Sequence, residues 1–139
     1  MFAAISTSVL CVLCTYALLS EDSDVSSGGP AVSGTCGTDL TWRFDQGSET
    51  LFIEGSGETM YSYYVLDTGS TAPWYAYHDH IKKIVFHTPN LKTIGDCSFF
   101  ECNVQSMDLP DGLKVLGRSC FSGCQNLTSL VIPSGVTDI

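Results

Sequence analysis

The apolar positions of residues 81–139 recur at a nearly constant interval. Three sets of apolar residues keep a spacing of 23 positions: Ile81, Val104 and Leu127; Ile84, Met107 and Leu130; and Phe86, Leu109 and Ile132. Between these sets, Phe99 and Phe121 lie 22 positions apart. A unit of this length cannot bury its own apolar face, whereas stacked units bury theirs against one another in continuous ladders. The pattern therefore predicts a stack of about two and a half repeats over residues 81–139.

Residues 36–80 follow a shorter period, in which apolar and polar residues alternate. The alternation is clear over residues 40–44, residues 50–54 form a second strand-like segment, and the residues between them have turn chemistry. This pattern predicts two strands paired as a hairpin. A dense aromatic group follows, formed by Tyr61, Tyr63, Tyr64, Trp74, Tyr75 and Tyr77. Such a group either fills a small core or offers a platform for carbohydrate. We expect residues 36–80 to form a small β-rich head.

The first twenty residues carry no charged side chain and contain an apolar run from Val9 to Cys14, after which acidic residues begin at Glu21. This arrangement is typical of a secretory signal peptide over residues 1–20, although no Lys or Arg stands near the N-terminus. The alternative is an uncleaved membrane anchor, which would be the only membrane contact, because about twenty apolar residues span a bilayer. Either alternative predicts a secreted or cell-surface protein in which residues 21–35, rich in Ser and Gly, form a linker.

The charged residues exclude several classes of function. Fifteen Asp and Glu against six Lys and Arg give a formal net charge of -9. Such a chain has no basic patch to neutralise nucleic-acid phosphates or anionic lipid, so we expect neither partner. His78, Asp79 and His80 form the densest group of acid–base or metal-binding side chains, but adjacent residues of an extended segment point to opposite faces. Because nucleophile, phosphate-loop and zinc-knuckle spacings are missing too, we expect a non-enzyme without catalytic residues, cofactor or metal.

At these repeats the chain resembles the BspA-like leucine-rich-repeat surface proteins, whose repeat reads approximately L-x-S-I-x-I-P-x-x-V-x-x-I-G-x-x-A-F-x-x-C. Residues 127–139 match its first half, and residues 94–102 and 116–124 match its second half. Short stretches at 34–37, 40–42, 51–57 and 72–75 also resemble the module that often precedes such repeats. The resemblance covers about residues 34–139. It departs from the family at Ser98 and Cys120, where Ala is usual, and at the additional thiol of Cys97.

The resemblance implies a mainly β fold, in which a short leucine-rich-repeat solenoid over residues 81–139, incomplete at its C-terminal end, is capped by the head at 36–80. It also implies adhesion to proteins, such as host or extracellular-matrix proteins, at the surface of anaerobic bacteria or parasitic protozoa. The alternative is a structural or assembly piece, a fragment of a longer surface protein whose open solenoid end self-associates with other repeats.

Six side chains are the candidate ligand-binding face of these repeats. Alternation along the repeat strands places them on the outer side, opposite the buried residues. They are Lys82, Lys83, Gln105, Asp108, Thr128 and Ser129.

Three further positions are candidates for covalent chemistry. Cys102 and Cys124 occupy equivalent places in adjacent repeats, and stacking would put them about 5 Å apart. They form either a disulfide or, because stacking constrains the dihedral angle that a disulfide needs, a ladder of buried free thiols. Asn126 begins an Asn-Leu-Thr sequon, which is a glycosylation acceptor if the protein is secreted from a eukaryotic cell.

Overall fold

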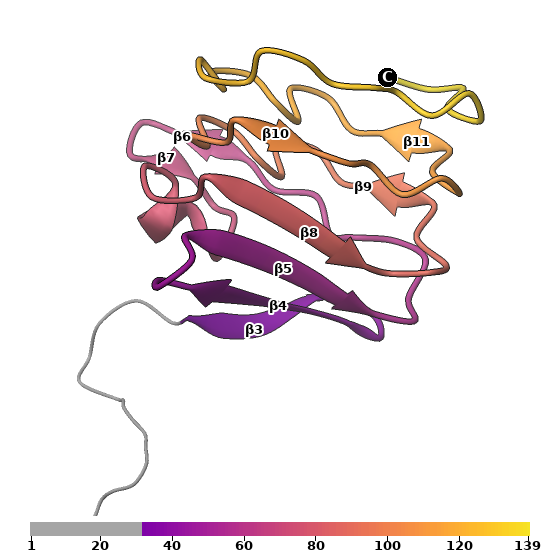
Figure 1. Cartoon of the computed structure of the whole chain (residues 1–139), viewed down its shortest axis with the longest axis horizontal. Coiled ribbons are helices and arrows are strands. Elements are labelled where there is room, and N and C mark those ends of the chain that lie inside the picture. The colour runs from indigo at the N-terminus through magenta and orange to yellow at the C-terminus, as the bar shows by residue number, and fades with distance from the viewer. Residues whose placement is uncertain (1–31) are drawn as a thin grey trace, which may run out of the picture. The chain divides into compact units, whose positions relative to one another are not determined.

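The computed structural model describes residues 32–139, which lie within one unit built almost entirely from β-strands (Figure 1). The mainly β class predicted from the sequence is therefore confirmed, and the helical structure among the described residues is limited to the 3-10 turn η2 (Tyr75–Tyr77). The predicted signal peptide at 1–20 and residues 21–31 of the predicted linker lie outside the described residues. Within the described part, no helix has the length and apolar character needed to cross a membrane.

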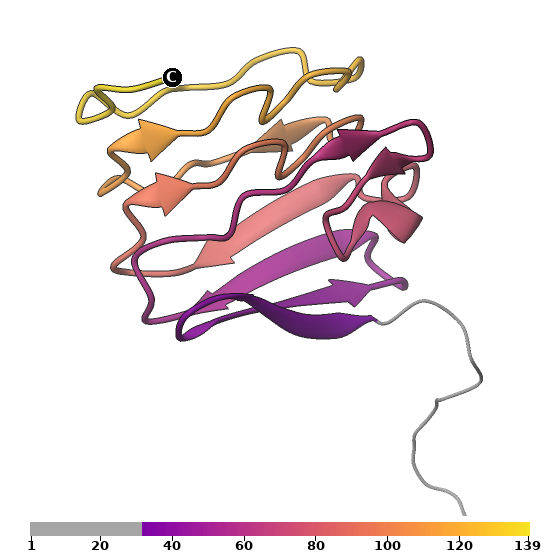
Figure 2. The same cartoon turned by 180° about the vertical axis from the view of Figure 1, so that it is seen from behind.

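Five strands form the main sheet, in the order β10-β8-β5-β4-β3. They are β3 (Ser33–Gly37), β4 (Leu40–Asp45), β5 (Thr50–Gly55), β8 (Lys83–His87) and β10 (Ser106–Met107). A parallel pair, β9 (Thr93–Ile94) and β11 (Val115–Leu116), lies on the opposite side of the molecule, as Figure 2 shows. The short strands β6 (Val65–Leu66) and β7 (Gly69–Ser70) form a separate hairpin.

The hairpin of β4 and β5 forms as the alternating pattern predicts. Leu40, Trp42 and Phe44 of β4 are buried, and the residues between them are exposed. The strands pair antiparallel from Leu40↔Gly55 to Asp45↔Thr50. At the turn, the Asp45 carboxylate accepts hydrogen bonds from the side chain and the backbone N–H of Ser48. These bonds favour the ionised carboxyl and lower the pKa of Asp45.

The main sheet continues across the predicted boundary between head and repeats at residue 80. β5 pairs in parallel with β8, from Thr50↔Lys83 to Glu54↔His87. At the other edge, β3 begins at Ser33 and pairs with β4, so residues 33–35 of the predicted linker belong to the sheet. One sheet therefore joins segments with different sequence periods. Residues of the predicted head and of the predicted repeats contribute to both of its faces.

Residues that are one repeat apart in the sequence stand side by side in space. In the main sheet Lys83 pairs with Ser106 and Ile84 with Met107, a separation of 23 residues in each case. On the opposite side, a column of parallel pairs runs from Thr59 through Thr93 and Val115 to Asp138. The pairs that lie within residues 81–139 are 22 or 23 positions apart, so residues one repeat apart are neighbours at these positions.

The core lies between the main sheet and this column, and an aromatic stack runs along it. Trp74 is fully buried and stacks on Phe99, with ring centroids 5.9 Å apart, and Phe99 stacks on Phe121 at 5.7 Å. The Trp74 indole N–H donates to the Ser98 carbonyl over 2.8 Å. Burying an indole removes roughly 200 Å² from water, which is worth at most about 5 kcal/mol. Trp74 thus serves as the first ring of the repeat ladder.

The aromatic group of residues 61–77 divides between core and surface. Trp74 and Tyr77 are buried, whereas the side chains of Tyr61 and Tyr64 are 50% and 70% exposed. Tyr63 packs its ring edge against Trp74, with the centroids 5.4 Å apart. The expectation of a core is met by part of the group, and the exposed tyrosines do not stack into one flat platform with it.

Gly117 tests the close approach of adjacent repeats. A Cβ at this position would lie 2.4 Å from the backbone carbon of Gly95, whereas a Cβ at Gly112 would make ordinary contact, 3.6 Å from the Leu91 oxygen. We therefore expect Gly117→Ala to lower the free energy of unfolding by about 1–3 kcal/mol, because backbone must move. Gly112→Ala, the matched control, should change it by less than about 0.5 kcal/mol. Urea denaturation measures both, and equal effects would contradict the close packing.

Candidate functional site

The outer side of the main sheet carries an ordered set of side chains in cross-strand register. Arg43, Phe52 and Val85 stand opposite one another on β4, β5 and β8. A second row beside it contains Thr41, Glu54 and His87. Because residues directly opposite in a sheet project from the same face, both rows form one surface. Their burial agrees with this position, since Arg43 and His87 are exposed and Phe52, Glu54 and Val85 are half-buried.

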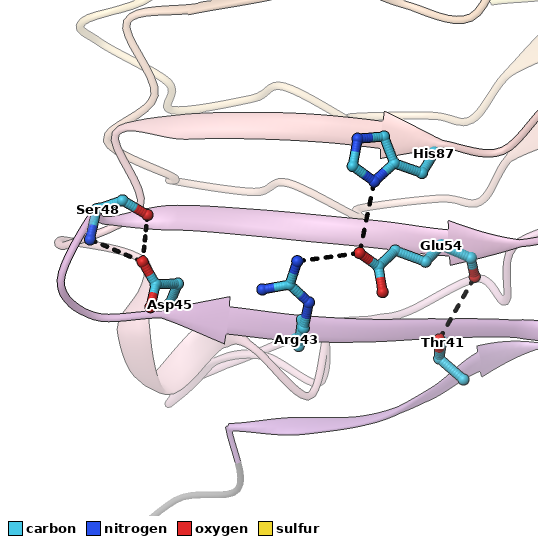
Figure 3. A network of polar contacts seen from close by, with 6 residues as sticks. All are labelled: Thr41, Arg43, Asp45, Ser48, Glu54 and His87. Carbon is cyan, nitrogen blue, oxygen red and sulfur yellow. Dashed lines mark hydrogen bonds and ion pairs between the residues drawn. The ribbon is translucent and has the colours of Figure 1, made fainter.

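Polar contacts hold the two rows together, as the close view in Figure 3 shows. The Arg43 guanidinium lies 3.8 Å from the centre of the Phe52 ring, and its Nη2 donates to Glu54 Oε2 over 3.1 Å. His87 Nδ1 lies 3.5 Å from the same carboxylate oxygen. The Phe52 and His87 rings are also in contact, with centroids 5.9 Å apart. Such exposed pairs add little to stability. Their effect is to give a surface arginine a defined position.

A shallow depression of about 340 Å³ lies next to these rows, where β8 and β10 meet. Its walls include Lys83, Val85, Ser106 and Asp108. Two of these, Lys83 and Asp108, are exposed groups of opposite charge, and Val85 supplies an apolar patch between polar neighbours. A depression of this volume has room for a side chain of a partner.

The structure separates the six residues predicted for the binding face. Lys83 and Asp108 border the depression, and Gln105, Thr128 and Ser129 are exposed. Lys82 precedes β8 and is half-buried, because its Nζ donates to Glu49 Oε1 over 2.8 Å. This bond lowers the pKa of the Glu49 carboxyl. Lys82 is thus engaged with the β4–β5 turn, while Lys83 makes no ion pair with any residue of 32–139.

The prediction omitted the residues that form the most ordered part of this face. These residues are Arg43, Phe52, Glu54 and His87. Phe52 lies within the apolar run 51–53 and gave no sign of facing outward, but the orientation of the three polar residues was readable from the sequence. Their proximity was not, because it depends on the parallel pairing of β5 with β8. The repeat pattern drew attention to residues 81–139, whereas three of these four residues come from the preceding hairpin.

A second, polar depression of about 300 Å³ is lined by residues that include His78, Asp79, Asn103 and Asn126. The His78 ring stacks on Tyr75 at 4.2 Å, and its Nε2 lies 3.5 Å from Asp79 Oδ1. The Tyr75 hydroxyl donates to Glu101 over 2.6 Å, and this bond raises the pKa of Tyr75 to about 12. Among residues 32–139, no group of three or more His, Cys, Asp or Glu is arranged to hold a metal ion.

The repeat geometry agrees with a comparison to known protein families. The model of the BspA type leucine rich repeat region, described as six copies, matches residues 73–139. These residues belong to the BspA-type leucine-rich repeat family. The BspA-type region therefore begins with Pro73 and Trp74, so that the first ring of the aromatic stack belongs to it.

A solved structure has a similar fold. It is a leucine-rich repeat protein from Eubacterium ventriosum ATCC 27560, which matches 78% of this chain with a TM-score of 0.62 and 20% sequence identity. The chain spans 28% of the length of that protein's chain. At this identity the likeness concerns the fold alone. No curated protein matches the chain.

Asn126 of the BspA-type region takes part in a ladder of side-chain hydrogen bonds. Its Nδ2 donates to Asn103 Oδ1, and Asn103 Nδ2 donates to the Asp79 carbonyl over 3.0 Å. Asn126 is exposed. A glycan on the sequon would be attached to Nδ2, the same atom that donates to Asn103. Glycosylation at Asn126 would leave a single N–H on this nitrogen for the bond to Asn103.

The cysteines of the described part are free thiols: Cys36, Cys97, Cys102, Cys120 and Cys124. Burial raises the pKa of Cys36 to about 12 and that of Cys124 to about 11. Burial likewise raises the pKa of Cys102 and of Cys120. Cys124 donates its thiol hydrogen to the Phe99 carbonyl over 3.0 Å. In this state the thiols pack as small apolar groups, while a disulfide between Cys102 and Cys124 stays a prediction.

Alkylation by iodoacetamide at pH 8 tests this state of the cysteines. The thiolate is the reactive form, so the buried thiols of Cys36, Cys102 and Cys120 should stay unmodified in the folded protein. Cys97, which is half-buried, should react first. After unfolding in guanidinium chloride without reductant, all five should react, as followed by peptide mass spectrometry. Continued resistance of Cys102 and Cys124 together would instead identify a disulfide between them.

Proposed function

We propose that this chain is a secreted or cell-surface binding protein that takes a protein partner on the outer side of its main sheet. The proposal includes a signal peptide at 1–20, a linker that ends before β3 begins at Ser33, and a β-rich head up to residue 80 that caps a repeat solenoid at 81–139. The membership of residues 73–139 in the BspA-type family supports a role in protein interaction at a surface. The partner class is a host or extracellular-matrix protein, and the activity is binding rather than catalysis.

The observation that carries the proposal is the in-register outer face. It combines an apolar centre, Phe52 and Val85, with polar and charged groups around it. Protein interfaces share this arrangement, in which a small apolar core with Arg or aromatic residues is surrounded by a polar rim. The sheet backbone fixes the spacing of these groups, so little conformational entropy is lost when a partner binds.

The experiment is a binding assay of the full chain against a panel of immobilised extracellular-matrix proteins. Lys83→Glu and the double variant Lys82→Glu with Lys83→Glu place negative charge beside the apolar centre, and we expect at least about tenfold weaker binding, equivalent to about 1.4 kcal/mol. Lys114→Glu is the matched control, since Lys114 is an exposed lysine next to β11, on the opposite side. Binding that survives reversal at Lys83, or falls equally with Lys114→Glu, would count against this face.

Self-association through the last repeat is a second candidate, favoured by a difference in burial. Phe99, Val104 and Leu113 are fully buried, but their counterparts one repeat later, Phe121, Leu127 and Val136, are only partly buried. Ile139 is 80% exposed. A further repeat, including one from a second copy of the chain, would cover these side chains.

Light scattering over a range of protein concentrations measures this self-association. We expect the apparent mass to rise with concentration, and Leu130→Lys, which charges the partly buried surface, to abolish the rise. Leu66→Lys is the matched control, because Leu66 is a 58% exposed leucine on β6. A constant monomer mass at all concentrations would exclude the second candidate and leave the first intact.

A further inference from the structure

The unused hydrogen-bonding capacity of the outer face points to one kind of partner. Of the carboxylates on this face, Glu54 accepts a bond from Arg43 and Asp45 accepts bonds from Ser48. Asp108 makes no ion pair with any residue of 32–139. The cations are less occupied than Glu54 and Asp45. Lys83 makes no ion pair with any residue of 32–139, and the Arg43 guanidinium uses one nitrogen for Glu54 out of a fork with five N–H donors. Among the residues around Phe52, the unused capacity is therefore largest in the N–H donors of Arg43 and Lys83.

The contacts of Arg43 also prepare it for a second acceptor. The Phe52 ring lies against one face of the guanidinium at 3.8 Å, and Glu54 fixes its rotation within the plane. A guanidinium held in this way has already lost much of its side-chain freedom, so less is lost when a carboxylate binds. Its exposed side chain, at 46% of full accessibility, leaves the rest of the fork open to a partner.

The sheet geometry sets the distance between the two cations. Arg43 and Val85 lie two strands apart in one row, and Lys83 lies two residues along β8 from Val85. With strands about 4.8 Å apart and a rise of about 3.4 Å per residue, the two Cα atoms are roughly 12 Å apart. An extended peptide spans a similar distance between its first and fifth residues, and its first, third and fifth side chains project from the same face.

We propose that Arg43, Phe52, Val85 and Lys83 are the energetic centre of the binding face, and that they take an extended acidic segment of a partner protein. Its central apolar side chain lies on Phe52 and Val85, and carboxylates at both ends bind Arg43 and Lys83. This inference rests on the proposed function and names its partner class. It also places part of the centre on β4 and β5, before the BspA-type region at 73–139 begins.

Three sources of negative charge oppose such a partner: the net charge of the chain, the Glu54 carboxylate beside Arg43, and the Asp108 carboxylate near Lys83. The net charge of -9 repels acidic peptides at long range, but in physiological salt the screening length of about 8 Å leaves the nearest cations in control. Asp108 lies on the wall of the depression beside Val85 and Lys83. A carboxylate bound at Lys83 would be repelled by Asp108, so removing this charge should tighten binding.

The test uses blocked pentapeptides and the full-length, isotope-labelled chain in nuclear magnetic resonance titrations. The probe is acetyl-Glu-Thr-Leu-Thr-Glu-amide, and the comparison peptide has Lys in place of both Glu residues. We expect saturable shifts of the Arg43 Nε–H signal and of the Phe52 and Val85 amides with the Glu peptide only. Arg43→Gln and Lys83→Gln should each weaken binding at least fivefold, and Asp108→Asn should strengthen it about twofold. Arg118→Gln, at another exposed arginine, is the matched control.

The outcomes distinguish this inference from the proposed function. Equal binding of the Lys peptide, or equal loss with Arg118→Gln, would overturn the acidic partner. Ser129→Arg, tested against the matrix-protein panel, reports on the repeat face away from Arg43. If Ser129→Arg weakens matrix binding while Arg43→Gln does not, the proposed function stands and this centre falls. If neither variant affects matrix binding, the proposed function falls as well.

Discussion

The register of the parallel strand pairs is the constraint on which the rest of the structure depends. Leu51, Ile84 and Met107 stand side by side because β5, β8 and β10 pair in parallel without offset. Side chains alternate between the two faces of a sheet, so a slip of one residue would turn the buried set outward and the outer set inward. The core and the candidate binding face are therefore two consequences of the same pairing.

The backbones of adjacent repeats also approach each other very closely. Gly117 lies so close to Gly95 that a side chain does not fit, and its N–H donates to the Ile94 carbonyl over 2.8 Å. This approach brings Phe121 onto Phe99, and Trp74 closes the stack at the other end. The buried thiols follow from the same packing, because burial without a nearby cation raises their pKa and keeps them protonated.

On the outer face, the sheet fixes the positions of side chains that are not deeply buried. Arg43 is positioned by an aromatic ring and a carboxylate, both of which belong to neighbouring places in the register. The groups there are suited to recognition, since they present fixed donors around an apolar patch. The BspA-type region and the hairpin before it contribute to one continuous surface, so the boundary of the sequence family does not coincide with the boundary of the face.

The sequence alone determined the features that depend on local or periodic patterns. The alternation of residues 40–44, followed by a turn and the strand-like residues 50–54, predicted the hairpin. The spacing of 23 residues predicted that Ile84 and Met107 would be neighbours. Both predictions use patterns that are visible in the sequence itself: alternation within one strand, and recurrence of the same residue type one repeat later.

Only the tertiary structure decided how the hairpin and the repeats meet. Glu54 and His87 are 33 positions apart, a separation that belongs to neither period. The parallel pairing of β5 with β8 brings the His87 ring into contact with the Glu54 carboxylate. The same junction binds Lys82 to Glu49 and leaves Lys83 free of ion pairs with residues 32–139, although the two lysines are adjacent. A contact between segments with different periods has no signature in either pattern. It is fixed by which apolar faces pack together, and that is a property of the folded chain.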